Sequence, residues 1–202
     1  MTPNTIPCID PRTGETVDHI PTTEMNQIAE QIAASRAAQQ SWFDKPLSER
    51  KDAVRNLHQA FLSAAEPIAD MLAQECGRPP GEAWTAEIVA NHDLFSWWLD
   101  RIDDLLMATP IDLNPINYPR KRGAVHLQPK GILGLITPWN LPIAIPLRTI
   151  VPAVLSGNGI IWKPSEHTPK TAQILDALFQ EHLEPGLVQC IIGGGEHGAA
   201  IV

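Results

Sequence analysis

Apolar residues recur every three to four positions along the first half of the chain, a spacing typical of amphipathic helices. This pattern predicts four helices, over about residues 22–43, 48–64, 66–76 and 81–106. Thr22 or Thr23 is expected to cap the first helix and Ser48 the second, because a side-chain hydroxyl can accept from an unpaired first-turn amide. The third helix is expected to end at Gly77, which is followed by two prolines.

An apolar stripe runs along the fourth of these helices and is rich in tryptophan. We interpret it as core or interface and not as a platform for a cofactor, since such stripes usually serve packing. Its members are Trp84, Ile88, Leu94, Trp97 and Trp98.

Two further segments have the pattern of antiparallel strand pairs. The first is an N-terminal hairpin that turns around Pro11–Gly14. The second is an arm in which Asn117–Arg122 and Ala124–Gln128 are expected to be extended, because nearby prolines prevent a long helix. An arm with exposed edges either stays short and charged or pairs with another chain. Its basic cluster Arg120–Arg122 is either a solvated edge or an anion site.

The second half of the chain changes to short apolar runs separated by turns. A strand over Gly131–Ile136, a helix over Pro146–Leu155 and a strand over Gly159–Trp162 form a predicted βαβ unit. A helix over Thr168–His182 and a strand over Leu187–Ile192 follow. The predicted fold class is therefore α/β, with N-terminal helices and a partial Rossmann-like parallel sheet. In such sheets the ligand site lies beyond the carboxyl ends of the strands.

Composition narrows the classes of partner. Hydrophobic residues make up 44% of the 202 residues, enough for a real core, and the net charge of −8 disfavours nucleic acid and anionic membranes as partners. We expect no signal peptide and no segment that crosses a bilayer. The three scattered cysteines suit a reducing cytoplasm, which is the expected location.

Asn140 is the first residue with chemical potential at the strand ends. Prolines at positions 138 and 142 stiffen its turn, so its side-chain amide is aimed by a rigid backbone. An amide held in this way can donate to a developing oxyanion. The alternative is that it bonds its own turn, as asparagine commonly does.

Lys163 and Glu166 follow the second strand of the βαβ unit. The carboxylate can accept from the vicinal hydroxyls of a ribose, and the lysine can donate to the same sugar or to a phosphate. The alternative is a surface ion pair of small energetic value. The glycine-rich loop Gly193–Gly198 could approach a phosphate with its amides or serve tight packing alone. We expect no metal site, since the seven histidines show no suitable pairing, and Cys190 reads as an inert core thiol.

At these residues the sequence resembles the NAD(P)-dependent aldehyde dehydrogenase superfamily, and the resemblance covers essentially the whole chain. ITPWNLP at 136–142 is similar to the family's ITPWNFP, and WKPSEHTP at 162–169 to its KPSExTP. The other matching segments are PAVLSGN at 152–158, ECGRP at 75–79 and PG at 185–186.

The resemblance implies roles for particular residues. Asn140 corresponds to the donor to the thiohemiacetal oxyanion, and Lys163 and Glu166 to the ligands of the adenosine ribose. The further residues that correspond to the cofactor cleft are Ile136, Thr137, Pro138, Trp139, Gly195 and Gly198. Because a glutamate would repel a 2′-phosphate, NAD is favoured as the cofactor, although NADP remains open.

The resemblance also implies a division of the chain. Residues 1–111 and 131–202 correspond to a partial cofactor-binding domain, and 112–130 to the family's oligomerisation arm. The family's nucleophilic cysteine and general-base glutamate lie downstream of residue 202, so the catalytic domain is expected to be absent from this chain.

Two hypotheses follow for the function. In the first, the chain is the N-terminal portion of an enzyme that oxidises an aldehyde to a carboxylic acid, inactive alone, with a homo-oligomer or a separate C-terminal chain as partner. In the second, it is a non-catalytic dinucleotide-binding or interaction module, or the remnant of a truncated gene.

Overall fold

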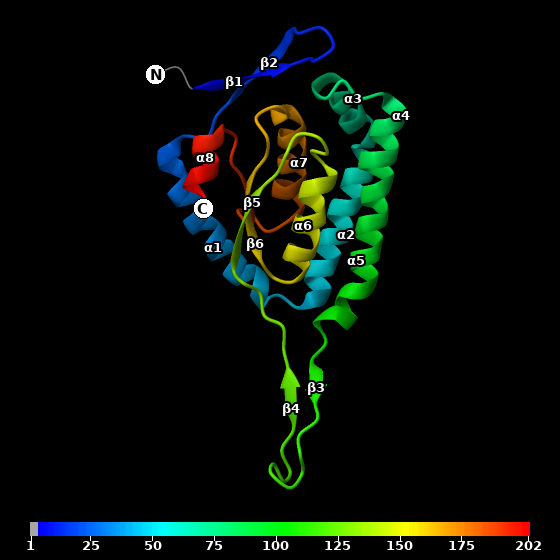
Figure 1. Ribbon diagram of the computed structural model, residues 1–202, viewed down its shortest axis with the longest axis vertical. Coiled ribbons are helices and arrows are strands. Elements are labelled where there is room, and N and C mark those ends of the chain that lie inside the picture. The colour runs from blue at the N-terminus through cyan, green and yellow to red at the C-terminus, as the bar shows by residue number, and fades with distance from the viewer. Residues whose placement is uncertain (1–3) are drawn as a thin grey trace.

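The computed structural model describes residues 4–202 and shows an α/β fold built in layers (Figure 1). A three-stranded parallel sheet lies in the middle, with α1 (Ile28–Asp44) against one face. The helices α6 (Ala144–Leu155) and α7 (Pro169–His182) lie against the other face. Outside them lie α2 (Leu47–Ser63) and α5 (Ala90–Leu106), so that α6 is buried on nearly all sides. No helix among the described residues is long and apolar enough to cross a membrane.

The predicted N-terminal helices are present, and α3 (Ala65–Glu75) ends before Gly77 as expected. The predicted caps are wrong. In the described part of the chain no side chain caps α1, which follows a 3₁₀ turn at Met25–Gln27, and Pro46 occupies the position before α2. The hydroxyl of Thr23 instead accepts from the amide of Ile192 at 3.0 Å, which ties the segment before α1 to the segment after the sheet.

The predicted fourth helix is interrupted. It consists of α4 (Pro80–Ala83), a π-helical segment at Trp84–Val89 and then α5. Within the apolar stripe, Ile88 is buried, whereas the side chains of Trp84 and Trp97 are 42% and 48% exposed. The core interpretation therefore holds for only part of the stripe.

Both predicted antiparallel pairs are present, but the second has other bounds. The N-terminal hairpin joins β1 (Thr5–Ile9) to β2 (Thr16–Pro21). The arm joins β3 (Thr109–Ile111) to β4 (Gly123–Val125) and projects away from the body (Figure 1). The prediction that residues 117–122 are extended is wrong: residues 117–120 form turns and a bend, with Arg120 in the left-handed region at φ 61°, and no strand begins before Gly123.

The parallel sheet has the order β5-β6-β7, formed by Ile132–Ile136, Gly159–Lys163 and Val188–Cys190. This confirms the βαβ unit, and the register places Ile136 opposite Lys163. Every residue of β6 is buried, whereas the outer edge of β5 pairs with no strand among residues 4–202. The carboxyl ends of β5 and β6 thus lie side by side, with β5 at an open edge. After the sheet comes the short helix α8 (Gly195–Ala200).

Candidate functional site

The turn that follows β5 begins with a firm connection to β6. The amide of Thr137 donates to the carbonyl of Lys163 at 3.1 Å, and the Thr137 hydroxyl accepts from the Trp162 indole at 2.9 Å. Thr137 and Trp162 are both buried. The side chain of Thr137 therefore serves the packing of the turn, and only its neighbours Ile136, Pro138 and Trp139 are exposed.

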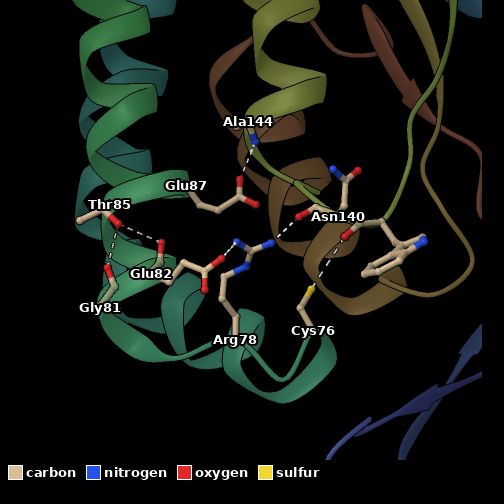
Figure 2. Close-up of polar contacts among 9 residues, drawn as sticks. Cys76, Arg78, Gly81, Glu82, Thr85, Glu87, Asn140 and Ala144 are labelled. Carbon is tan, nitrogen blue, oxygen red and sulfur yellow. Dashed lines mark hydrogen bonds and ion pairs between the residues drawn. The ribbon is translucent and has the colours of Figure 1, made fainter.

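Asn140 lies at the exposed tip of this turn. Among the described residues, no hydrogen-bond partner is found for its side-chain amide, so the alternative in which the amide bonds its own turn is not the observed arrangement. Its main-chain carbonyl accepts from the Arg78 guanidinium (Figure 2). The turn is held through its backbone while the amide stays free to donate.

Lys163 and Glu166 form an ion pair with an Nζ–Oε2 distance of 2.9 Å. The Lys163 side chain is only 5% exposed, whereas that of Glu166 is 42% exposed. The hydrogen bond from Lys163 lowers the pKa of Glu166, which keeps this carboxylate charged. The pair is therefore unlike an ordinary surface ion pair, since its cation is buried at the end of the central strand and its anion faces open space.

An open pocket of about 450 Å³ lies at the carboxyl end of β5 and β6. Four of the predicted site residues meet around it: Ile136, Lys163, Gly195 and Gly198. A Cβ added at Gly198 would lie 3.5 Å from Ile136 Cδ1, so a side chain there would narrow the space between α8 and β5. Glu166 lines the neighbouring pocket, and its bond to Lys163 connects the two. A charged acceptor and a charged donor beside open space can bond neighbouring hydroxyls of a ligand.

Trp139 lines a different pocket, of about 420 Å³, together with Cys76 and His167. The structure thus separates the predicted residues into a group around Lys163 and a group in the exposed Asn140 turn.

Sequence reasoning missed the role of Glu75, which is almost fully buried. Its carboxylate accepts from the amides of Lys170 and Thr171 at 2.8 and 2.7 Å and from the Thr171 hydroxyl at 2.6 Å. These are first-turn donors of α7, so Glu75 caps the helix that follows the Lys163–Glu166 turn. The one sequence signal was the resemblance of residues 75–79 to a family motif, which carried no role for this side chain.

Glu87 was also missed. It lies in the π-helical segment, is fully buried, and accepts from the amide of Ala144 at the start of α6 at 2.7 Å. Its second carboxylate oxygen, Oε1, has no partner among the described residues. Burial raises the pKa of Glu87 to about 7.

The three cysteines do not supply a reactive thiolate at this site. Burial raises the pKa of Cys8 to about 12 and that of Cys76 to about 11, and it raises the pKa of Cys190 as well. All three are therefore protonated at neutral pH, and only a thiolate is an effective nucleophile. In the part of the chain that the structure describes, no cluster of three or more histidine, cysteine or carboxylate side chains could hold a metal ion.

Comparison with known proteins gives a consistent result. The model of the aldehyde dehydrogenase family matches residues 1–202. An N-succinylglutamate 5-semialdehyde dehydrogenase of Novosphingobium aromaticivorans is 32% identical over 205 residues, covering 94% of this chain and 41% of that protein. A 4,4'-diapolycopene aldehyde oxidase of a Methylomonas species is 29% identical over 199 residues, covering 98% of this chain and 38% of that protein.

Solved structures show the same relation. An aldehyde dehydrogenase of Brucella melitensis superposes with a TM-score of 0.89 at 27% identity, covering 98% of this chain and 40% of that one. PnpE, solved in complex with nicotinamide adenine dinucleotide, superposes with a TM-score of 0.90 at 24% identity, with the same coverage. The chain thus spans about 40% of the length of these relatives and matches their N-terminal portion.

Proposed function

Because the chain belongs to the aldehyde dehydrogenase family, we propose that it forms the ribose-binding and oxyanion-donating part of an enzyme that oxidises an aldehyde to a carboxylic acid with NAD⁺. The Lys163–Glu166 pair at the end of β6 carries this proposal. Its buried cation is bonded to a half-exposed carboxylate beside an open pocket, so the pair offers a charged donor and a charged acceptor to a ligand there.

The position of this pair supports a dinucleotide as the ligand. In open α/β sheets the ligand crevice lies at the strand where the strand order reverses. The order β7-β6-β5 matches one half of such a sheet, so we expect the crevice beside the outer edge of β5, next to Ile136 and Lys163. Glu166 would accept from the 2′-hydroxyl of NAD and would repel the 2′-phosphate of NADP, so NAD is the proposed cofactor.

Asn140 supplies the second part of the proposed function. Its free amide would donate to the oxygen that becomes negatively charged when a thiolate adds to the aldehyde, and NAD⁺ supplies the hydride acceptor. Because the three cysteines of this chain are held as thiols, the nucleophile is proposed to come from outside residues 1–202. The relatives are about two and a half times as long as this chain, which leaves room for such a segment in them.

The arm supports a proposal about assembly. It presents exposed apolar side chains, including Ile116 and Leu127, which are 86% and 63% exposed. A projecting hairpin with apolar side chains and free edges is suited to pairing with another chain. We propose residues 112–130 as the contact of a homo-oligomer, in the cytoplasm.

Calorimetry tests the cofactor proposal. The purified chain is titrated with NAD⁺, NADP⁺ and ADP-ribose. We expect NAD⁺ and ADP-ribose to bind alike, because both carry the adenosine ribose, and NADP⁺ to bind more weakly. Lys163→Met and Glu166→Gln should each weaken NAD⁺ binding about tenfold, the effect of losing one hydrogen bond to a charged group.

Lys51→Met is the matched control, since Lys51 is a largely buried lysine that pairs with Asp103 away from the site. Its NAD⁺ affinity should equal that of the unaltered chain. Binding that is absent, or equally strong in the Lys163 and Glu166 variants, would contradict the proposed cofactor site. Binding by this chain with no activity after a complementary C-terminal segment is added would favour a non-catalytic dinucleotide-binding module.

A further inference from the structure

Arg78 connects α4 to the turn that carries Asn140. Its guanidinium donates through Nη2 to the Asn140 carbonyl and through Nη1 to Glu82 Oε1 at 2.7 Å, and the side chain is only 12% exposed. In Figure 2 the guanidinium lies between the Glu82 carboxylate and the main chain of Asn140, whose side-chain amide points away from it. Gly77, with φ 62°, provides the reversal of the chain that brings Arg78 to this place.

Glu87 holds the other end of the same segment. The Glu87 carboxylate accepts from the amide of Ala144 (Figure 2). Ala144 is the first residue of α6 and lies only four residues after Asn140. The main chain of Glu87 is fixed by Asn91, whose side-chain amide donates to the Glu87 carbonyl at 2.6 Å. The segment 140–144 is therefore held at its first carbonyl and at its last amide.

The helical residues from Pro80 to Val89 carry both acidic side chains: Glu82 lies in α4 and bonds Arg78, and Glu87 lies in the π-helical segment and bonds Ala144. Glu82 and Glu87 are five residues apart, and the wider turns of the intervening π-helical residues keep them closer to one face than α-helical turns would. Such single-turn π segments are frequent at functional sites. Glu82 bonds Arg78, four residues earlier, and the π-helical segment carries Glu87 to the start of α6 (Figure 2).

From these contacts we propose that Arg78 and Glu87 are positioning residues for Asn140, which fix its turn at both ends so that the amide faces a substrate oxyanion. The proposal rests on the oxyanion role proposed for Asn140. Neither residue touches the substrate: the two terminal nitrogens of Arg78 are occupied by protein acceptors, and Glu87 is fully buried. An arginine suits the task because its planar fork can bond a carbonyl and a carboxylate at once.

Nuclear magnetic resonance on the isotopically labelled full chain tests this proposal. A spectrum that correlates the amide of Leu141 with the carbonyl carbon of Asn140 reports the bond from Arg78. We expect Arg78→Met to shift this carbonyl signal upfield, and Arg78→Lys, which can still donate, to restore most of the shift. Hydrogen exchange at the Ala144 amide reports the bond to Glu87. Glu87→Leu should lower its protection about tenfold, whereas Glu87→Gln, which keeps an acceptor oxygen, should retain it.

Amides of β6 serve as internal reporters, and Arg55→Met, which removes an arginine paired with Asp52 on α2, is the matched control. An unchanged Asn140 carbonyl signal in Arg78→Met, or unchanged Ala144 protection in Glu87→Leu, would overturn the proposal. Equal loss of protection at Ala144 and in β6 would overturn it too, because it would mean a general structural role. NAD⁺ affinity should stay unchanged in both variants. If the unaltered chain does not bind NAD⁺, the proposed function is contradicted. The Asn140 carbonyl signal and the Ala144 protection would still decide whether Arg78 and Glu87 position the turn.

Discussion

The turns after β5 and β6 lie next to each other and are held in opposite ways. The β6 turn is internal: Lys163 and Ser165 are buried, and Lys163 finds its partner Glu166 three residues later. The β5 turn is external: Pro138, Trp139 and Asn140 are exposed, and its supports come from Cys76, Arg78 and Glu87, more than fifty residues earlier. Lys163 and Glu166 bond each other within one turn. The Asn140 side chain makes no such bond in the described chain, so its turn is held through the backbone by residues from another part of the chain.

One short segment reaches both turns. Glu75 caps α7, which follows the β6 turn, and Arg78 bonds the β5 turn. The residues between the end of α3 and the start of α4 therefore fix the relative positions of the two turns. Substitutions at Glu75 and at Arg78 should affect the β6 turn and the β5 turn separately.

The largest effect is expected from Glu75→Ala. It leaves the amides of Lys170 and Thr171 and the Thr171 hydroxyl without their acceptor, and a buried unsatisfied group costs about 1–3 kcal/mol. We expect the free energy of unfolding in urea to fall by about 4 kcal/mol. Glu66→Ala, at an exposed position of the same helix, should change it by less than about 0.5 kcal/mol. Similar values for both variants would show that Glu75 does not support the β6 side of the site.

The next effect concerns the dependence of stability on pH, which has opposite signs for Glu87, beside the β5 turn, and for Glu166 in the β6 turn. Burial raises the pKa of Glu87 from about 4.5 to about 7, so the folded protein favours the protonated form. The stability that this group contributes is present below pH 4.5 and is lost as the pH rises to about 7. Glu87→Gln should remove this dependence and be more stable than the unaltered chain at pH 8 by at most about 3 kcal/mol. Urea unfolding between pH 4 and pH 8 measures it, and parallel pH profiles would contradict the buried charge.

A smaller effect is expected from Thr137→Val, which removes the side-chain bond between Thr137 and Trp162 and keeps the main-chain bond from Thr137 to Lys163. The variant keeps the shape of the side chain but leaves the buried Trp162 indole N–H without an acceptor. We expect a loss of about 1–2 kcal/mol in the free energy of unfolding. Thr137→Ser keeps the hydroxyl and should recover most of this loss. If the valine variant is as stable as the serine variant, the hydrogen bond from Trp162 to Thr137 does not contribute to stability.

The smallest effect on stability is expected from Glu166→Gln. The hydrogen bond from Lys163 lowers the pKa of Glu166, so its contribution is present above the unfolded pKa near 4.5 and is lost as the pH falls below it. Because this carboxylate is half-exposed, the change at pH 7 should be about 0.5 kcal/mol. Urea unfolding at pH 7 and pH 3.5 checks the sign. A loss of several kcal/mol would make the pair a structural bridge and weaken its role as a ribose ligand.

Much of the fold was accessible from the sequence because its signals are local. Hydrophobic periodicity located the helices, and the apolar runs ending in Pro-bearing turns located β5 and β6 and placed Lys163 at a strand end. The predicted cap of α1 was wrong because Thr23 has a partner in Ile192, 169 residues away, that no local pattern reveals. The predicted cap of α2 was wrong because the helix begins earlier, directly after Pro46. The bounds of the arm were wrong because its prolines allow turns as readily as extended chain.

The sequence by itself determined the parallel βαβ unit, the family and the candidates Asn140, Lys163 and Glu166, since periodicity and motifs are properties of neighbouring residues. Only the tertiary structure decided which of them are free and which are held. Among residues 4–202 it left the Asn140 amide without a partner, buried Lys163 against Glu166, and brought Glu75, Arg78 and Glu87 to the two turns. Those contacts depend on how α3, the π-helical segment and α6 pack together, and packing across so many residues leaves no repeating pattern along the chain.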